Sequence, residues 1–301
     1  MLAAAALALA WVLDAAFGEP RSAWHPVAWF GRAVAPAGRW AATLAPLPGV
    51  VGGAVLWLLA VGGVVVLAGL VQQAAAGLTP WAGVLMLGVA LKPAFAWRML
   101  EDEVRAVDAA LAQGLDAGRA RLARLCSRDV SQLDAVAVRE TALESLAENF
   151  NDSLVAPLFW FAVAGLPGAW AWRAANTLDA MWGYRGRWEW AGKCAARADD
   201  LLAWLPARLA AALLWRPAIG VARLRAQARR TPSPNGGWPM ATLALRLDVR
   251  LAKPGVYELH ADGRAADAGA VARALRLVDH AARLAVVLAI AGLLGAHAPW
   301  R

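Results

Sequence analysis

Cysteine and charge are both scarce in this chain. Its 301 residues include only 2 Cys, and 17% of them are charged. Cys126 and Cys194 lie far apart and in no C-x-x-C pattern, which excludes a cysteine-based zinc site and a disulfide framework. The sequence also lacks a G-x-x-x-x-G-K-S/T phosphate loop and a G-x-G-x-x-G turn after a strand. Any ATP site must therefore be of another kind.

Apolar residues, by contrast, are abundant. The chain is 60% hydrophobic, contains 17 Trp and has a mean hydropathy of +0.47. A soluble domain is typically about half apolar and about a quarter charged, and Trp is enriched at membrane–water interfaces. We therefore predict a mainly α-helical, polytopic integral membrane protein.

The net charge of +8 would by itself suggest a nucleic-acid partner. The basic residues, however, lie in the connections between apolar runs, as the positive-inside rule predicts for a membrane protein. We expect no nucleic-acid partner, and membrane lipid as the surrounding medium.

Four apolar runs are expected to cross the membrane, because each is near the about 20 residues that a span needs. They are 1–17 (short), 47–71, 80–97 and 281–298. The first run lacks a basic n-region and an A-x-A site, so we expect a retained helix and not a cleaved signal peptide. Two further runs are interrupted: 154–175 by Gly165-Leu166-Pro167-Gly168, and 201–221 by prolines and arginines.

The distribution of Lys and Arg predicts the topology. Regions 18–46, 98–153, 173–200 and 222–280 hold 3, 7, 5 and 10 of them, whereas 72–79 holds none. All four basic regions should then face the cytoplasm of a multi-pass protein in the cytoplasmic membrane. This requires the two interrupted runs to dip in and return, or to lie at the interface. Broken backbone is tolerated at membrane depth where protein or water surrounds it.

The chain is accordingly predicted to be one domain, 1–301, with two cytoplasmic regions. The first, 98–153, should be helical, with a turn at Gly114 and Gly118. The second, 222–280, should contain in order a basic helix, a Pro/Gly turn cluster, short strands and a further helix. Their expected bounds are Arg223–Arg230, Thr231–Pro239, 248–262 and Ala268–Arg283.

A stripe of carboxylates carries the clearest chemical signal. Glu140, Glu144, Glu148 and Asp152 recur at a four-residue interval, which places them on one face of a helix. One interpretation is a solvated face near Arg128 and Arg139. The abutting apolar segment Leu154–Ala164 favours another, a site for Mg²⁺ carrying phosphates, because carboxylates near a membrane are costly unless paired or metal-bound.

Three more groups invite a functional interpretation. Ser233–Gly237 follows two arginines and could offer backbone N–H groups to a phosphate, although an ordinary loop is the alternative. Asn176 and Asp179, with Arg197, Asp199 and Asp200, could form a second metal or base cluster. A helix N-terminus stabilised by its dipole is the competing explanation for the aspartate pair. Lys92 is expected to snorkel rather than to pair with an acidic cluster.

These groups occur, in order, in a pattern that resembles the cobalamin-biosynthesis membrane family CobD/CbiB, the adenosylcobinamide-phosphate synthases. The similarity runs over nearly the whole chain. It is carried by Asp14…Gly18-Glu19-Pro20…His25-Pro26-Val27…Gly31, Ser127-Arg128-Asp129, Glu144-Ser145-Leu146-Ala147-Glu148-Asn149…Asp152, Asn176-Thr177-Leu178-Asp179, Ala198-Asp199-Asp200-Leu201…Pro206-Ala207-Arg208 and Ser233-Pro234-Asn235…Gly237-Trp238-Pro239. Glu19 departs from the usual Asp, Thr231 from a common His, and Met240 from a common Glu.

The resemblance implies ATP-dependent formation of an amide bond. The partners would be adenosylcobyric acid, a corrinoid, and an amino-alcohol phosphate, either (R)-1-amino-2-propanol phosphate or ethanolamine phosphate, with Mg²⁺ as cofactor. The catalytic residues implied are Glu144, Glu148, Asp152, Asp179, Asp199 and Asp200, the first three also as Mg²⁺ ligands. The substrate- and phosphate-binding residues implied are His25, Arg128, Asn149, Asn176, Arg197, Ser233, Asn235 and Gly237.

Two other functions stay open at this point: a non-catalytic membrane regulator or sensor, and a corrinoid carrier. The complete set of motifs disfavours the first. The absence of an internal repeat in the sequence disfavours the second, because transporters commonly place polar residues in repeated halves. The preferred amino-alcohol phosphate, the order of the partial reactions, the oligomeric state and any contact with other membrane enzymes of cobalamin assembly are left undecided.

Overall fold

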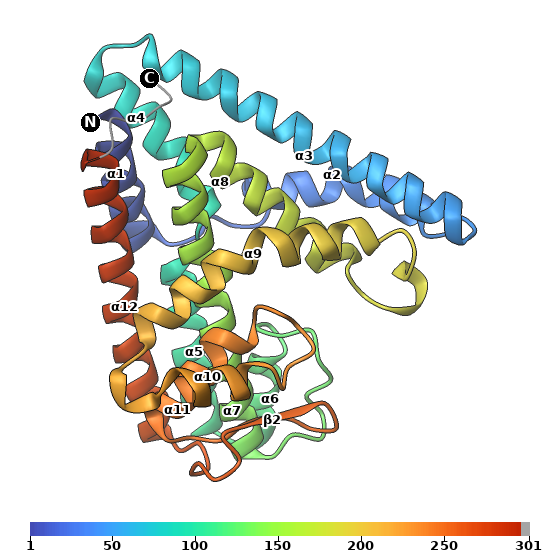
Figure 1. The fold of residues 1–301 in the computed structure, drawn as a ribbon, viewed down its shortest axis with the longest axis vertical. Coiled ribbons are helices and arrows are strands. Elements are labelled where there is room, and N and C mark those ends of the chain that lie inside the picture. The colour runs from blue at the N-terminus through green and yellow to red at the C-terminus, as the bar shows by residue number, and fades with distance from the viewer. Residues whose placement is uncertain (296–301) are drawn as a thin grey trace. The chain divides into compact units, whose positions relative to one another are not determined.

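The computed structural model describes residues 1–295, and these residues are mainly helical (Figure 1). The α-helices are α1 Leu2–Phe17, α2 Pro26–Ala41, α3 Pro46–Ala76, α4 Pro80–Leu91, α5 Trp97–Leu111, α6 Leu115–Leu122, α7 Ala135–Phe150, α8 Ala156–Trp182, α9 Lys193–Leu214, α10 Val221–Ala228, α11 Gly237–Leu247 and α12 Ala268–Gly295. Short helical turns are η1 Lys92–Ala94, η2 Asn151–Val155, η3 Gly186–Trp188 and η4 Pro217–Ile219, and the strands are β1 Leu251–Lys253 and β2 Tyr257–Leu259.

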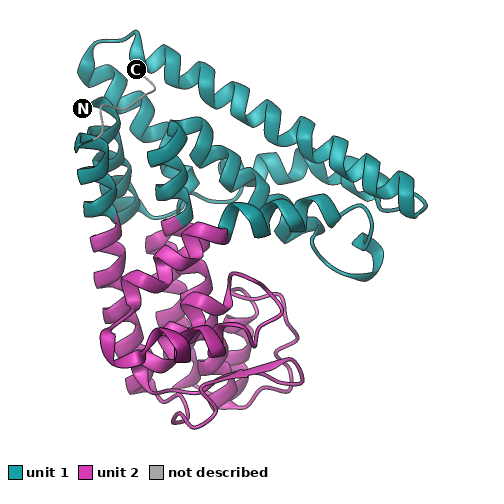
Figure 2. Ribbon diagram, viewed as in Figure 1, with its two compact units in different colours: residues 1–96, 156–203, 286–301 teal, residues 97–155, 204–285 magenta. Residues whose placement is uncertain are grey.

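The chain forms two compact units (Figure 2). Unit 1 comprises Met1–Ala96, Ala156–Ala203 and Val286–Arg301, and unit 2 comprises Trp97–Val155 and Trp204–Ala285. Unit 2 therefore contains all of 98–153 and 222–280, two of the four regions predicted to be cytoplasmic. The prediction of a single domain over 1–301 stays a prediction.

Four helical stretches are long and apolar enough to cross a membrane, as predicted. They are Pro46–Ala76, Pro80–Leu111, Ala135–Trp182 and Ala268–Gly295. The segments that make up these four stretches differ from the predicted ones in two respects. Helix α1 has only 16 residues, whereas the interrupted run 154–175 lies within one of the four. The predicted span 281–298 continues the helix predicted from Ala268, and its last three residues lie outside the described part of the chain.

Close helix packing in unit 1 depends on glycine. Helix α4 packs along α1, and α3 packs along α8. A Cβ atom at Gly83 of α4 would lie 2.5 Å from the carbonyl oxygen of Ala75, and one at Gly88 would lie 3.0 Å from that of Ala6. Small residues let helix backbones approach this closely inside a membrane.

Helix α8 is broken where the sequence predicted. Ala164 and Gly165 have non-helical backbone angles, and the φ of Gly165 is 65°. The break frees the N–H of Leu166, which donates to Gln72 Oε1 of α3 at 2.8 Å. A polar side chain from a neighbouring helix thus satisfies a backbone group that the break leaves without an intrahelical partner.

The other interrupted run behaves differently. Helix α9 continues through Pro206 and ends at Leu214, so 201–221 is interrupted only after that point, before η4. It is absent from the helical stretches long and apolar enough to span a membrane.

Unit 2 has a small core of its own, formed by Val107, Leu122, Leu133, Val138 and Ala142 from α5, α6, α7 and the loop before α7. The predicted helices and short strands are confirmed, with two corrections. Gly118 lies inside α6 and only Gly114 marks the turn, with a φ of 147°. The predicted turn cluster ends earlier than expected, because Gly237, Trp238 and Pro239 form the first turn of α11, where proline is tolerated.

Candidate active site

The acidic stripe lies on α7 and on the π-helical turn η2 that follows it. Glu140 and Glu144 are 2% and 1% exposed, whereas Glu148 is exposed and Asp152 is half-buried. A solvated helix face is therefore the wrong interpretation for the first two carboxylates. Buried carboxylates need partners, and both have an arginine: Arg250 lies 3.2 Å from Glu140, and Arg128 lies 2.7 Å from Glu144.

Glu144 has the most unusual surroundings of the four. Arg128 donates to its Oε2, and a second guanidinium nitrogen of Arg128 donates to Thr141 Oγ1 at 3.0 Å. The other carboxylate oxygen, Oε1, is buried and has no hydrogen-bond donor within 3.5 Å among the described residues, although the Tyr257 hydroxyl lies nearby. An unsatisfied buried acceptor costs about 1–3 kcal/mol, so this oxygen is a place where a ligand donor or a cation would be stabilised.

The hairpin β1–β2 forms another wall of this site. Strand β1 packs against α7, and Tyr257 of β2 lies beside Glu144. Burial, and then the negative charge of Glu144, raise the pKa of Tyr257 well above its usual range, so its hydroxyl keeps its proton. The hydroxyl also lies 3.8 Å from the sulfur of Met240. Met240, which departs from the family pattern, is thus buried against the site.

The Ser-Pro-Asn loop approaches the stripe at Gly236, where a Cβ atom would lie 3.1 Å from Glu148 Oε1. Its backbone N–H groups are less available to a phosphate than the sequence suggested. Ser233 Oγ accepts from the N–H groups of Asn235 and Gly236, each at 3.1 Å. At Gly237 a Cβ atom would lie 2.1 Å from the carbonyl oxygen of Ala228, so this glycine permits close packing of α10 and α11.

Arg208 of α9 holds the same loop. It donates to Asn235 Oδ1 at 2.5 Å and to the carbonyl oxygen of Pro234 at 3.0 Å. Its guanidinium also lies over the rings of Trp204 and Trp238, with centroid distances of 4.7 and 4.9 Å. The amide oxygen of Asn235 is therefore engaged within the protein.

Helices α8 and α9 assemble a second acidic group within unit 1. Asn176 donates to Asp199 Oδ1 at 3.2 Å, and the charges of Asp179 and Asp200 are close enough to repel each other. Burial raises the pKa of Asp200, and Arg197, 3.9 Å away, offsets part of the rise. Helix α9 begins at Lys193, so the aspartate pair does not lie at a helix N-terminus. Carboxylates with raised pKa values are suited to proton transfer.

The first sequence motif forms a buried charge network in unit 1. Lys92 lies 3.1 Å from Asp14 and also pairs with Glu19, which in turn contacts His25. Snorkelling was thus the wrong prediction for Lys92. Burial alone would raise the pKa of Glu19, but the hydrogen bonds of His25 and Lys92 outweigh it and lower that pKa. His25 also accepts the N–H of Val27 at the start of α2, so both ring nitrogens have protein partners.

The remaining predicted residues are placed as follows. Asn149 donates to the carbonyl oxygen of Ser145 in its own helix at 2.9 Å, and Asp152 accepts from Asn151 at 2.7 Å. Arg197 is 86% exposed at its side chain. Within residues 1–295, no three His, Cys, Asp or Glu side chains are grouped closely enough to hold a metal ion.

The donor set nevertheless fits Mg²⁺. This ion is commonly bound by one or two carboxylates together with substrate phosphates and water, not by a complete protein cage. The unsatisfied Oε1 of Glu144 and the exposed carboxylate of Glu148 match that requirement.

Sequence reasoning missed Tyr257, Lys253 and Arg250. They lie in residues 250–257, where the sequence has no acidic stripe, no glycine pattern and no motif of the family resemblance. Arg208 belongs to one motif of the family resemblance, but the sequence alone assigned it no role. A weak signal existed for Lys253, because the chain has very few lysines among its 30 basic residues.

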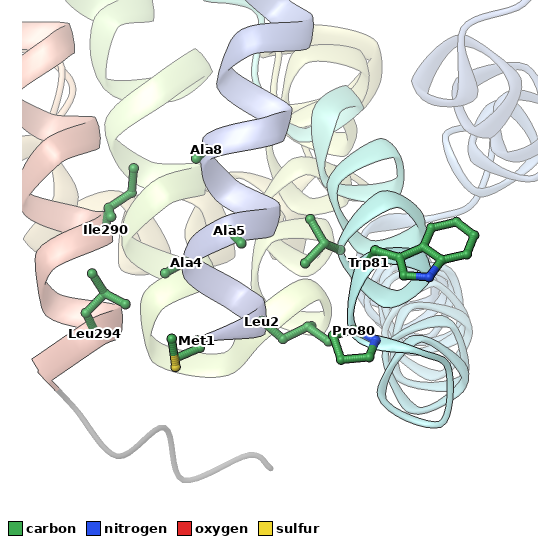
Figure 3. Close-up of a pocket in the computed structure, with 10 residues that line it drawn as sticks. Met1, Leu2, Ala4, Ala5, Ala8, Pro80, Trp81, Ile290 and Leu294 are labelled. Atoms are coloured by element: carbon green, nitrogen blue, oxygen red, sulfur yellow. The ribbon is translucent and has the colours of Figure 1, made fainter.

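Unit 1 also contains an apolar cavity of about 620 Å³ (Figure 3). Met1, Leu2 and Ala5 of the N-terminal segment line it together with Trp81 of α4 and Ile290 of α12. None of its ten lining side chains is charged.

Comparison with known proteins gives a consistent result. A sequence model described as CobD/Cbib protein matches residues 7–285. Cobalamin biosynthesis protein CobD of Rhodobacter capsulatus is 41% identical over 268 residues, which cover 84% of this chain and 83% of the relative. The proteins of that name from Stutzerimonas stutzeri and Klebsiella pneumoniae are 42% and 36% identical, over 83% of this chain and 83% and 82% of the relatives. No solved structure matches the chain.

The family match extends from α1 into α12 and takes in both acidic groups, the Ser-Pro-Asn loop and the hairpin. Each of the three relatives is matched over more than four-fifths of its length. This chain therefore belongs to the CobD/Cbib protein family.

Proposed function

We propose that the protein acts in cobalamin biosynthesis by joining adenosylcobyric acid to an amino-alcohol phosphate through an ATP-dependent amide bond. Family membership supports the role in cobalamin biosynthesis. The observation that carries the chemical step is Glu144, a buried carboxylate with one oxygen on Arg128 and the other unsatisfied.

The reaction has three chemical requirements. A carboxylate is a poor electrophile, so ATP first transfers a phosphoryl group to it, giving an acyl phosphate and ADP. The amine then attacks the acyl carbon, the C–N bond forms, and phosphate leaves with the electrons of the C–O bond. The ammonium must lose a proton before it attacks, so a general base is needed.

The described residues offer groups for these requirements. In this proposal Glu144 and Glu148 would bind the ammonium or hold Mg²⁺, which would neutralise nucleotide charge when bound. Asp179, Asp199 and Asp200 form the candidate base group, since burial raises the pKa of Asp200. Arg128 orients Glu144, because its guanidinium donates to both Glu144 Oε2 and Thr141 Oγ1. His25, Asn235 and Gly237 act through the loops and helices that they position.

We further propose that the protein resides in the cytoplasmic membrane with this site facing the cytoplasm. The four apolar helical stretches support a membrane location. The basic residues concentrated in the connections support the orientation.

Purified protein, incubated with adenosylcobyric acid, (R)-1-amino-2-propanol phosphate, Mg²⁺ and ATP, tests the proposed reaction. Mass spectrometry should detect adenosylcobinamide phosphate, and omission of ATP should abolish it. Folded protein that binds the corrinoid without forming product would contradict the ligase and favour a corrinoid carrier. Protein that binds neither substrate would favour a membrane regulator.

A further inference from the structure

Lys253 differs from the other two lysines of the chain because, among the described residues, no carboxylate lies within 4 Å of its ammonium, although Glu144 and Glu148 attract it from further away. Lys92 is buried in ion pairs with Asp14 and Glu19. Lys193 is exposed, with its ammonium 4.4 Å from the centroid of the Trp190 ring. Lys253 is half-buried, and in the part of the chain that the structure describes it forms no ion pair within 4 Å.

The hairpin holds Lys253 next to the acidic stripe. Lys253 is the cross-strand partner of Tyr257, and directly paired residues of two strands project from the same face. Tyr257 reaches Met240 of α11 and lies beside Glu144, so that face is turned towards the site. The ammonium of Lys253 is close enough to Glu144 and Glu148 to attract both charges.

The neighbouring arginines are already committed. Arg128 binds Glu144 and Thr141, Arg250 binds Glu140, and Arg208 binds Asn235 and Pro234. Lys253 is therefore the cation of this site, among the described residues, whose side chain has neither an ion pair within 4 Å nor a hydrogen bond, since even Arg208, which has no ion pair, is held by neutral acceptors.

The site therefore offers both negatively and positively charged groups to a ligand. Glu144 Oε1 is buried with no hydrogen-bond donor within 3.5 Å, Glu148 is exposed, and Lys253 is a cation with no ion pair within 4 Å among the described residues. A ligand with an ammonium at one end and a phosphate at the other would satisfy all three groups. A lysine ammonium binds phosphate as a point charge, whereas a neutral or purely anionic ligand would bring no positive charge to Glu144 Oε1 or to Glu148.

We propose that Lys253 binds the phosphate of the amino-alcohol phosphate, while Glu144 and Glu148 face its ammonium end. This inference rests on the proposed function for the identity of the ligand. It assigns the hairpin a role in recognising one substrate, and it makes Tyr257 a positioning residue that supports Glu144.

Calorimetric titration of the purified full-length protein tests the inference without requiring turnover. The ligands are (R)-1-amino-2-propanol phosphate and the same amino alcohol without its phosphate. Lys253→Met should weaken binding of the phosphate compound by about tenfold or more, the range expected for a charge-assisted hydrogen bond. It should change binding of the phosphate-free compound by less than about twofold, since that compound lacks the group that Lys253 recognises.

Two further variants control for structural damage. Lys253→Arg keeps the charge and should restore part of the affinity, and Lys193→Met removes an exposed lysine and should leave both affinities unchanged. Equal weakening of both ligands by Lys253→Met, or no weakening, would overturn the inference. Wild-type protein that shows the predicted binding but makes no product would overturn the proposed function and leave the role of Lys253 standing.

Discussion

At the scale of single residues, Lys92 shows how a buried charge is stabilised in this protein. Its partners Asp14 and Glu19 lie more than 70 positions earlier in the sequence, and the three side chains are 10%, 1% and 8% exposed. Sequence spacing reveals only local pairs, so snorkelling looked the safer prediction. The pairing depends on how α1 and α4 pack, which no local pattern encodes.

Removing the positive charge of Lys92 should strongly lower the free energy of unfolding. Lys92→Met keeps the apolar stem but leaves Asp14 and Glu19 buried without it, and we expect a loss of about 3–5 kcal/mol in the free energy of unfolding. Denaturant titration in detergent, followed by Trp fluorescence, measures the loss. Arg98→Met is the control, because Arg98 and Asp102 are 46% and 49% exposed and such pairs contribute about 0–1 kcal/mol. Equal losses in the two variants would contradict the account of the buried network.

The residues of the candidate site also differ in whether a local sequence pattern could reveal them. Glu144 and Glu148 could be found from their four-residue spacing, which is a local helical signal. Arg128 was found through its motif. Tyr257 and Lys253 come from a two-stranded hairpin over a hundred residues later, and only the folded chain brings them to α7. Local periodicity therefore identified one wall of the site and missed the other.

At the scale of elements, the break in α8 was predictable and its partner was not. Gly165-Leu166-Pro167-Gly168 indicates a break, because glycine adopts positive φ and proline lacks an N–H. Gln72, which accepts from Leu166, lies near the C-terminal end of a different helix, α3. The opposite error occurred at α11, where the cluster of Gly and Pro was read as a turn although it starts a helix.

Replacing Gln72 should therefore lower the free energy of unfolding more than replacing its neighbour Gln73. Gln72→Leu removes the acceptor for the Leu166 N–H, and we expect a loss of about 1–3 kcal/mol in the free energy of unfolding. Gln73→Leu is the matched control, because Gln73 is exposed in the same helix. The same denaturant titration distinguishes them. A Gln73 effect as large as the Gln72 effect would show that the break does not depend on this hydrogen bond.

At the scale of the whole molecule, the number of helical stretches long and apolar enough to cross a membrane was predicted correctly, and their identity only in part. Composition is enough to reveal long apolar helices. It does not decide whether a 16-residue helix such as α1, or an interrupted stretch such as Ala135–Trp182, crosses the bilayer.

The charge distribution makes a testable prediction about sidedness. Arg187 is exposed in η3, in a basic region predicted to face the cytoplasm. In a background carrying Cys126→Ala and Cys194→Ala, a cysteine substituted for Arg187 should react with a membrane-impermeant maleimide only after the membrane is opened. Labelling in intact cells stripped of their outer membrane would place this loop on the opposite side.

The central claim is that the buried Glu144 group serves ligation, and Glu144→Gln tests it most directly. Glutamine keeps the size of the side chain but removes the charge that pairs with Arg128. Glu189→Gln is the matched control, because Glu189 pairs only loosely with Lys193, at 3.6 Å on the surface. We predict that Glu144→Gln lowers the rate of adenosylcobinamide phosphate formation by about 100-fold or more, as expected when a reacting-site interaction of a few kcal/mol is lost, while membrane insertion and the Glu189→Gln rate stay near wild type. A Glu144→Gln rate close to that of Glu189→Gln would contradict the account.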